Sequence, residues 1–165
     1  MSNWCSNKLT IIGNKDNLTM LKDILRGIDT DICLNNIVPM PMELNDTQSP
    51  GDKPNWYDWR MNNWGIKWDV EAHLVYESEQ MLIYEFDSPW GPPDLWVKNV
   101  ALMFPDLSFE LYYKEPGMCF QGTISAQQDL FIDKIEDYYE EIDEFVDQDE
   151  YYEDDQDVIT IIKRE

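Results

Sequence analysis

The chain has 165 residues and a mass of 19.6 kDa, the size of one ordinary domain with little room for a second. Apolar residues make up 43% and include seven Trp, nine Tyr and six Phe, enough for a core, so global disorder is excluded. The 34 acidic side chains outnumber the 12 basic ones and give a net charge of −22. This balance excludes direct binding of nucleic acid or of an anionic membrane and favours a partner with a basic surface.

The sequence carries no signal for export or for a metal centre. It has no run of 18 apolar residues and no basic-then-apolar start, so we expect a cytoplasmic protein without a membrane partner. Cys5, Cys33 and Cys119 are widely spaced and fit reduced thiols rather than a disulfide framework. With His73 alone and no EF-hand loop, we expect no metal and no cofactor.

The first quarter of the chain predicts one strand and one helix. Residues 8–12 are rich in strand-forming side chains and end at Gly13, which begins a turn. The following apolar side chains recur at helical spacing: Leu18, Leu21, Ile24, Leu25 and Ile28. Residues 29–55 contain four prolines and little periodicity, which predicts a long loop.

The middle of the chain predicts a further set of elements after a tryptophan-rich segment at 56–68. Strands are expected at 70–76, 81–86, 107–113 and 118–124, and a second helix at 95–104. The order strand, helix, strand, strand, helix, strand is typical of the ferredoxin-like pattern. We therefore predict an α+β domain over residues 1–126, an antiparallel sheet with two helices on one face.

The composition changes sharply after residue 126. Residues 129–157 contain 15 carboxylates against the single cation Lys134. A stripe at helical spacing runs through the same segment, formed by Phe131, Ile135, Tyr138, Ile142 and Phe145. It predicts a helix over about 127–147 that docks on the domain and points its acids outward. With a short edge strand at 158–162, this makes an acidic C-terminal extension over residues 127–165.

Several tryptophan and proline motifs carry a family resemblance. They lie in order at residues 3–9, 37–41, 56–60, 63–69, 88–93, 104–107 and 115–118. With these motifs the chain resembles the YubB-like family, proteins of phages and conjugative plasmids with a ferredoxin-like domain. The resemblance implies that fold and a host-cell cytosol, but no reaction. It covers about residues 1–124 and leaves the acidic extension unmatched.

Two surfaces compete as the candidate site. The first is a pocket roofed by tryptophans, with polar groups converging on it: Trp56, Trp59, Arg60, Asn63, Trp64 and Trp90. It suits a small ligand or a nucleotide, although core packing explains the same residues. Nucleophilic catalysis would require an activated nucleophile beside a base, and no such motif occurs, so we expect no enzyme.

The second surface is the acidic face of the extension. Its carboxylates are Asp133, Glu136, Asp137, Glu140, Glu141, Asp143, Glu144, Asp147, Asp149, Glu150, Glu153, Asp154 and Asp155. Carboxylates held on a scaffold imitate phosphates and can occupy the basic groove of a nucleic-acid-binding protein. The sequence thus favours a DNA mimic that inhibits a host defence protein, such as a CRISPR effector or a restriction nuclease. The alternatives are a ligand-binding protein, an interaction module without mimicry, and a merely solubilising tail.

Overall fold

The computed structural model describes residues 3–138 of the chain. Six strands and three α-helices follow one another as β1 (Trp4–Ile12), α1 (Lys15–Leu25), α2 (Trp56–Asn63), β2 (Ala72–Glu77), β3 (Met81–Pro89), α3 (Asp94–Met103), β4 (Ser108–Glu115), β5 (Phe120–Gln127) and β6 (Leu130–Asp137). Three short 3₁₀ turns add η1 (Leu34–Asn36), η2 (Met42–Leu44) and η3 (Pro116–Met118).

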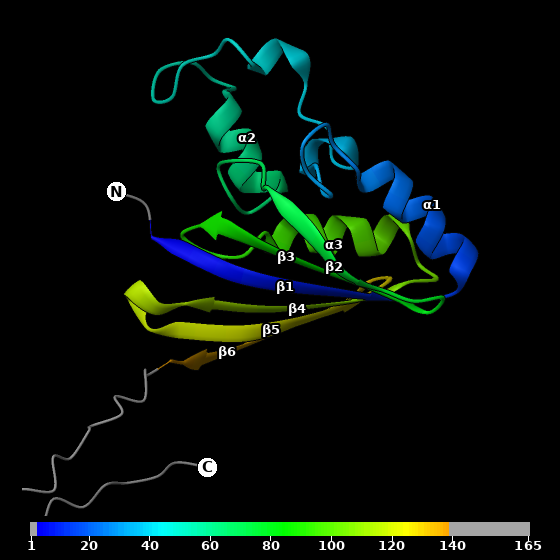
Figure 1. Cartoon of the computed structure of the whole chain (residues 1–165). Helices are drawn as coiled ribbons and strands as arrows, with labels where there is room; N and C mark the ends of the chain where they lie inside the picture. The colour runs from blue at the N-terminus through cyan, green and yellow to red at the C-terminus, as the bar shows by residue number, and fades with distance from the viewer. Residues whose placement is uncertain (1–2, 139–165) are drawn as a thin grey trace, which may run out of the picture.

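The strands form one antiparallel sheet in the order β2-β3-β1-β4-β5-β6 (Figure 1). The helices gather on one side of this sheet, and no described element covers its other side (Figure 1). The predicted α+β class and the antiparallel sheet are therefore confirmed. We call the uncovered side the open face.

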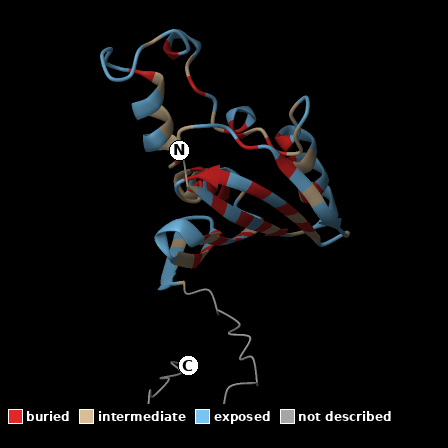
Figure 2. Ribbon diagram, turned by 60° about the vertical axis from the view of Figure 1, so that its left-hand side comes forward, coloured by how far each residue is buried: buried red, intermediate tan, exposed pale blue. Residues whose placement is uncertain are grey.

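Alternation along the strands separates the core from the open face (Figure 2). In β1 the side chains of Cys5, Leu9 and Ile11 are fully buried beneath the helices, whereas Trp4 and Lys8 are exposed. Successive side chains of a strand point to opposite faces, so each strand contributes to both surfaces. The open face is consequently a polar and aromatic surface built on the back of a hydrophobic core.

Helix α1 is capped by Asn14, whose side chain accepts a hydrogen bond of 2.9 Å from the Asn17 amide. The predicted stripe is buried at Leu18, Leu21 and Leu25. Its last member, Ile28, is fully exposed, which corrects the prediction that this stripe reaches residue 28. The helix ends at Leu25, so the spacing that would bury Ile28 is no longer helical.

Helix α2 is a third helix that the sequence pattern did not predict. Asn55 caps it by accepting a hydrogen bond from the Asp58 amide at 2.9 Å. None of its side chains is fully buried. Its half-buried side chains recur at helical spacing, at 56, 59, 60 and 63, but two of the four are polar, so the apolar stripe that marks an amphipathic helix is incomplete.

Two buried tryptophans fasten the long loop to the helical layer. The indole N–H of Trp64 donates to the Val38 carbonyl at 2.9 Å, and that of Trp96 donates to the Leu34 carbonyl at 3.1 Å. Both rings are at most 1% exposed. A buried indole is satisfied only if its N–H finds an acceptor, and here the loop carbonyls supply it.

The predicted helix over 127–147 is wrong where the structure describes it. Residues 130–137 form β6, which pairs with β5 from Gln127 opposite Leu130 to Phe120 opposite Asp137. Gln128 takes a positive φ of 54° in the intervening turn. The hairpin satisfies the backbone hydrogen-bonding groups of both strands. The apolar spacing predicted a helix because residues four apart share one face of a strand as well as one face of a helix. The sheet thus continues past the expected boundary at residue 126, and the edge strand expected at 158–162 lies outside the described residues.

No helix among residues 3–138 is long and apolar enough to cross a membrane.

Candidate functional site

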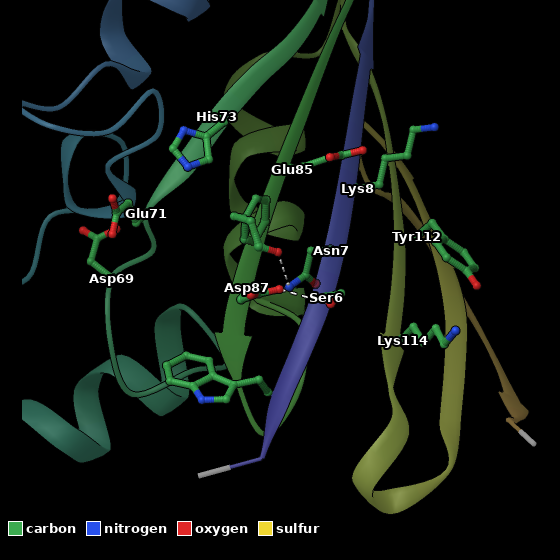
Figure 3. A pocket seen from close by; sticks show the side chains of 12 residues that line it. Ser6, Asn7, Lys8, Asp69, Glu71, His73, Glu85, Asp87, Tyr112 and Lys114 are labelled. Atoms are coloured by element: carbon green, nitrogen blue, oxygen red, sulfur yellow. Dashed lines mark hydrogen bonds between the residues drawn. The ribbon is translucent and has the colours of Figure 1, made fainter. Parts of the chain in front are cut away.

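The open face contains a hollow of about 890 Å³ lined by side chains from β1, β2, β3 and β4. Its lining includes carboxylates, lysines, a histidine and aromatic rings, with few aliphatic groups. Figure 3 shows the carboxylates on the side of β2 and β3 and the lysines on the side of β1 and β4, with Glu85 next to Lys8 where the two groups meet. Ligand sites are concave and present a few converging polar groups, so this hollow is the candidate functional site.

The acidic side of the hollow is formed by Asp69, Glu71, Glu85 and Asp87 (Figure 3). Glu85 and Asp87 lie on alternate positions of β3, and the other two precede β2. Asp87 accepts a hydrogen bond of 3.1 Å from the Ser6 hydroxyl across the β1 and β3 pair. The four carboxylates thus gather from segments far apart in the sequence.

Asp69 differs from the other three carboxylates because both of its oxygens accept hydrogen bonds from backbone amides. It accepts hydrogen bonds of 2.8 Å from the amides of Leu34 and Val70, and one of 3.2 Å from the amide of Asn35. These bonds tie the segment before β2 to η1. Asp69 is thus a structural carboxylate at the edge of the site, and Glu71, Glu85 and Asp87 are better placed to meet a ligand.

The basic side of the hollow carries Lys8 on β1 and Lys114 on β4, with Tyr112 between them in the lining (Figure 3). Lys8 pairs with Glu85 of β3 on one side of β1 and with Tyr112 of β4 on the other side. The ammonium of Lys114 lies 4.0 Å from the ring centroid of Tyr138. The charge therefore changes sign between β3, which carries Glu85 and Asp87, and the strands β1 and β4 that follow it in the sheet.

An exposed aromatic pair lies at one end of the hollow, where Trp4 belongs to the lining and Trp68 contacts Trp4. Trp4 begins β1 and lies with its ring centroid 6.3 Å from that of Trp68, the two planes inclined by 37°. Trp4 is 53% exposed and Trp68 is 42% exposed. The ammonium of Lys67 lies 4.1 Å from the centroid of the Trp68 ring. Two large rings are thus held at the protein surface beside the carboxylates.

The tryptophan pocket predicted from the sequence maps to α2 and the residue after it. The guanidinium of Arg60 lies 5.2 Å from the ring centroid of Trp56 and 5.1 Å from that of Trp64. Trp59 contacts Trp64 edge to face at 5.8 Å, and Asn63 donates to the Trp59 carbonyl at 2.7 Å. A cation of the chain itself consequently lies over both the Trp56 and the Trp64 rings.

Trp90, the remaining residue of that predicted pocket, follows β3 and is 47% exposed. It has a positive φ of 69°, and its amide donates to the Asn3 carbonyl at 2.9 Å. Within the described part of the chain, no ring contact joins it to the tryptophans of α2 or to Trp64. Trp90 thus belongs to the end of the sheet where β1 begins.

Three residues of the predicted acidic face, Asp133, Glu136 and Asp137, lie on β6. Asp133 accepts a hydrogen bond of 2.7 Å from the Tyr113 hydroxyl, while Glu136 and Asp137 are exposed. The other ten lie outside the described residues: Glu140, Glu141, Asp143, Glu144, Asp147, Asp149, Glu150, Glu153, Asp154 and Asp155. Among residues 3–138, no group of three or more His, Cys, Asp and Glu side chains is arranged to hold a metal ion.

Buried tyrosines make the stability of the fold sensitive to alkaline pH. Burial raises the pKa of Tyr84 and Tyr113, and the bond to Asp133 raises that of Tyr113 further. The folded chain keeps these protons to a higher pH than the unfolded chain, so their contribution is intact below about pH 10 and falls above it. We expect urea unfolding to show a smaller loss of stability between about pH 8 and about pH 10.5 in a Tyr84→Phe, Tyr113→Phe variant than in the unmodified chain. An equal loss in both would contradict this assignment.

The residues of the hollow were largely missed by sequence reasoning. The first strand was expected to start at residue 8, which left Trp4 and Ser6 outside it. Extending the first strand back to Trp4 and the strand at 81–86 forward to Asp87 places Trp4, Ser6 and Asp87 on the open face, because side chains alternate between the two faces of a strand. Nothing in the sequence indicates that Trp68 meets Trp4, because that contact depends on where the loop before β2 runs.

Comparison with known proteins agrees with the architecture. The crystal structure of a protein api92 from Yersinia pseudotuberculosis superposes with a TM-score of 0.57 at 10% identity, covering 84% of this chain and 99% of that chain. This likeness supports the fold alone. No curated protein matches the sequence.

The family described as the ferredoxin-like domain in Api92-like protein matches residues 63–161. The matched region begins near the end of α2 and extends through the acidic segment, which the sequence reading had left outside the family pattern. It covers more than half of the chain. The chain therefore belongs to the family of proteins with the Api92-like ferredoxin-like domain.

Proposed function

We propose that the protein is a non-enzymatic binding protein that takes a basic surface of a partner protein onto the open face of its sheet. The observation that carries the proposal is the hollow of about 890 Å³, in which carboxylates from β3 and from the segment before β2 gather beside exposed aromatic rings. A partner's lysines and arginines would meet Glu71, Glu85 and Asp87 there.

The charge of the whole chain supports a basic partner. A net charge of −22 attracts cationic surfaces at long range and repels nucleic acid and other acidic proteins. Complementary charge accelerates encounter and selects against wrong partners more than it adds affinity. The hollow then supplies the short-range contacts that long-range electrostatic attraction does not provide.

The partner class that fits best is a nucleic-acid-binding protein, because its groove presents many cations in one place. Residues 139–165 hold 12 of the acidic side chains and so add to the negative charge that such cations would meet. Occupation of such a groove would exclude DNA or RNA, which makes the protein a mimic and an inhibitor. The resemblance to YubB-like proteins of phages and plasmids favours a host defence protein as the target.

The proposal predicts that binding depends on the three carboxylates of the hollow. A Glu71→Gln, Glu85→Gln, Asp87→Asn variant should bind a fluorescent lysine- and arginine-rich peptide roughly tenfold more weakly, since three exposed charge pairs are lost. A matched control, Glu43→Gln, Asp46→Asn, Asp106→Asn, removes the same charge from exposed positions outside the hollow and should weaken binding less than about twofold. Fluorescence anisotropy at about 0.15 M salt measures both.

Equal losses in the two variants would mean that only net charge matters and would overturn the open face as the site.

A separate experiment tests mimicry. Replacing Glu140, Glu141, Asp143 and Glu144 with lysine should abolish competition with a DNA duplex for a DNA-binding partner. Undiminished competition by this variant would contradict mimicry by the extension.

A further inference from the structure

We propose that Trp4 and Trp68 form a receptor for an arginine side chain of the basic partner. This inference rests on the proposed function and names the group that the acidic side of the hollow recognises. It is built from the exposed aromatic pair, the carboxylates beside it and the cation that Trp68 already binds.

The exposure of the two rings calls for an explanation beyond packing. Trp4 is 53% exposed and Trp68 is 42% exposed, although a tryptophan is among the side chains that gain most from burial. Their centroids are 6.3 Å apart and their planes are inclined by 37°, so the rings do not lie flat against each other. Parts of both ring surfaces are therefore left to solvent next to the hollow.

Cations already bind to tryptophan faces in this chain. The Lys67 ammonium lies 4.1 Å from the Trp68 centroid, within the distance at which a ring quadrupole attracts a cation. The Arg60 guanidinium lies 5.2 Å from the ring centroid of Trp56 and 5.1 Å from that of Trp64. The Trp4 ring has no such cation among the described residues.

The carboxylates decide which cation fits. Trp4, Glu71 and Asp87 line the same hollow. A guanidinium is planar, so it stacks on an indole while its N–H groups donate in the ring plane to a carboxylate. An ammonium offers no flat face and is more strongly hydrated. The arrangement therefore favours arginine over lysine.

The test uses the full chain with isotope-labelled tryptophan and three short peptides in which glycine alternates with arginine, lysine or citrulline. The arginine peptide should shift the indole N–H resonances of Trp4 and Trp68 and leave unchanged that of Trp56, which belongs to α2 on the helical side of the sheet (Figure 1). It should bind several-fold more tightly than the lysine peptide. The uncharged citrulline peptide should not bind.

A variant pair separates the aromatic contribution from general packing. Trp4→Leu should weaken binding of the arginine peptide roughly tenfold, which is the scale of one cation–π contact that is partly shielded from water. Tyr76→Leu removes a comparably exposed aromatic ring, 51% accessible, from outside the lining of the hollow and should change the affinity less than about twofold. Urea unfolding of both variants confirms that the fold is retained.

The outcomes distinguish this inference from the proposed function. Equal affinity for the arginine and lysine peptides, together with an unchanged Trp4→Leu variant, would overturn the receptor and leave the carboxylate site in place. Retained binding in the variant lacking Glu71, Glu85 and Asp87 would overturn both. Binding lost instead in a Leu130→Ser, Ile132→Ser variant would place the partner on the exposed apolar end of the open face and overturn the receptor.

Discussion

Replacing Leu25 with aspartate is expected to lower the free energy of unfolding by about 4 kcal/mol, the scale of an unpaired charge placed in a core. Leu25 is the last residue of α1 and is fully buried in the core cluster. The new carboxyl would have to lose its hydration or take up a proton, and either costs free energy. Urea unfolding followed by tryptophan fluorescence measures the change.

The neighbouring Ile24→Asp variant is the matched control. Ile24 is 40% exposed and lies in the same last turn, so both variants meet the unfavourable helix dipole equally. We expect the control to lose no more than about 1 kcal/mol. Similar losses in the two variants would show that the burial of Leu25 is not what stabilises this helix.

Replacing Trp96 with alanine is expected to cost about 4 kcal/mol, because it empties the space of the largest side chain of α3 and removes the donor to Leu34. Trp96→Phe retains most of the volume and leaves the Leu34 carbonyl without its partner, for a cost of about 2 kcal/mol. The difference between the two variants measures the packing contribution separately from the hydrogen bond.

Leu102→Ala is the control on the same helix, since that side chain is 50% exposed. Its cost should stay below about 1 kcal/mol. Calorimetric melting of the three variants checks the order. If the phenylalanine variant were as unstable as the alanine variant, the bond to the loop would outweigh the packing of the ring.

Local pattern was sufficient for most of the core architecture. The stripe at Leu18, Leu21 and Leu25 identified α1, and the apolar run at 81–86 identified β3. These signals are strong because each element buries a face against the same sheet, so its apolar residues recur at the period of its own geometry. The class and the covered face of the sheet follow from them.

The segment after residue 126 was read wrongly because its pattern is ambiguous. Phe131 and Ile135 lie four residues apart, which suits one face of a helix and one face of a strand equally. The choice was made by the adjacent β5, whose free edge accepts β6 across a turn at Gln128. A backbone partner of this kind is invisible to a count of apolar spacings.

The sequence by itself determined the acidity, the α+β class and the buried faces of the main elements, since charge and periodicity are properties of neighbouring residues. Only the tertiary structure decided that Arg60 lies over the rings of both Trp56 and Trp64, and that Trp4 meets Trp68 beside the carboxylates. The open face unites residues from the start of the chain with residues more than 60 positions away. Such a meeting depends on strand order and on the path of a long loop, and both are set by the packing of the whole chain rather than by any local preference.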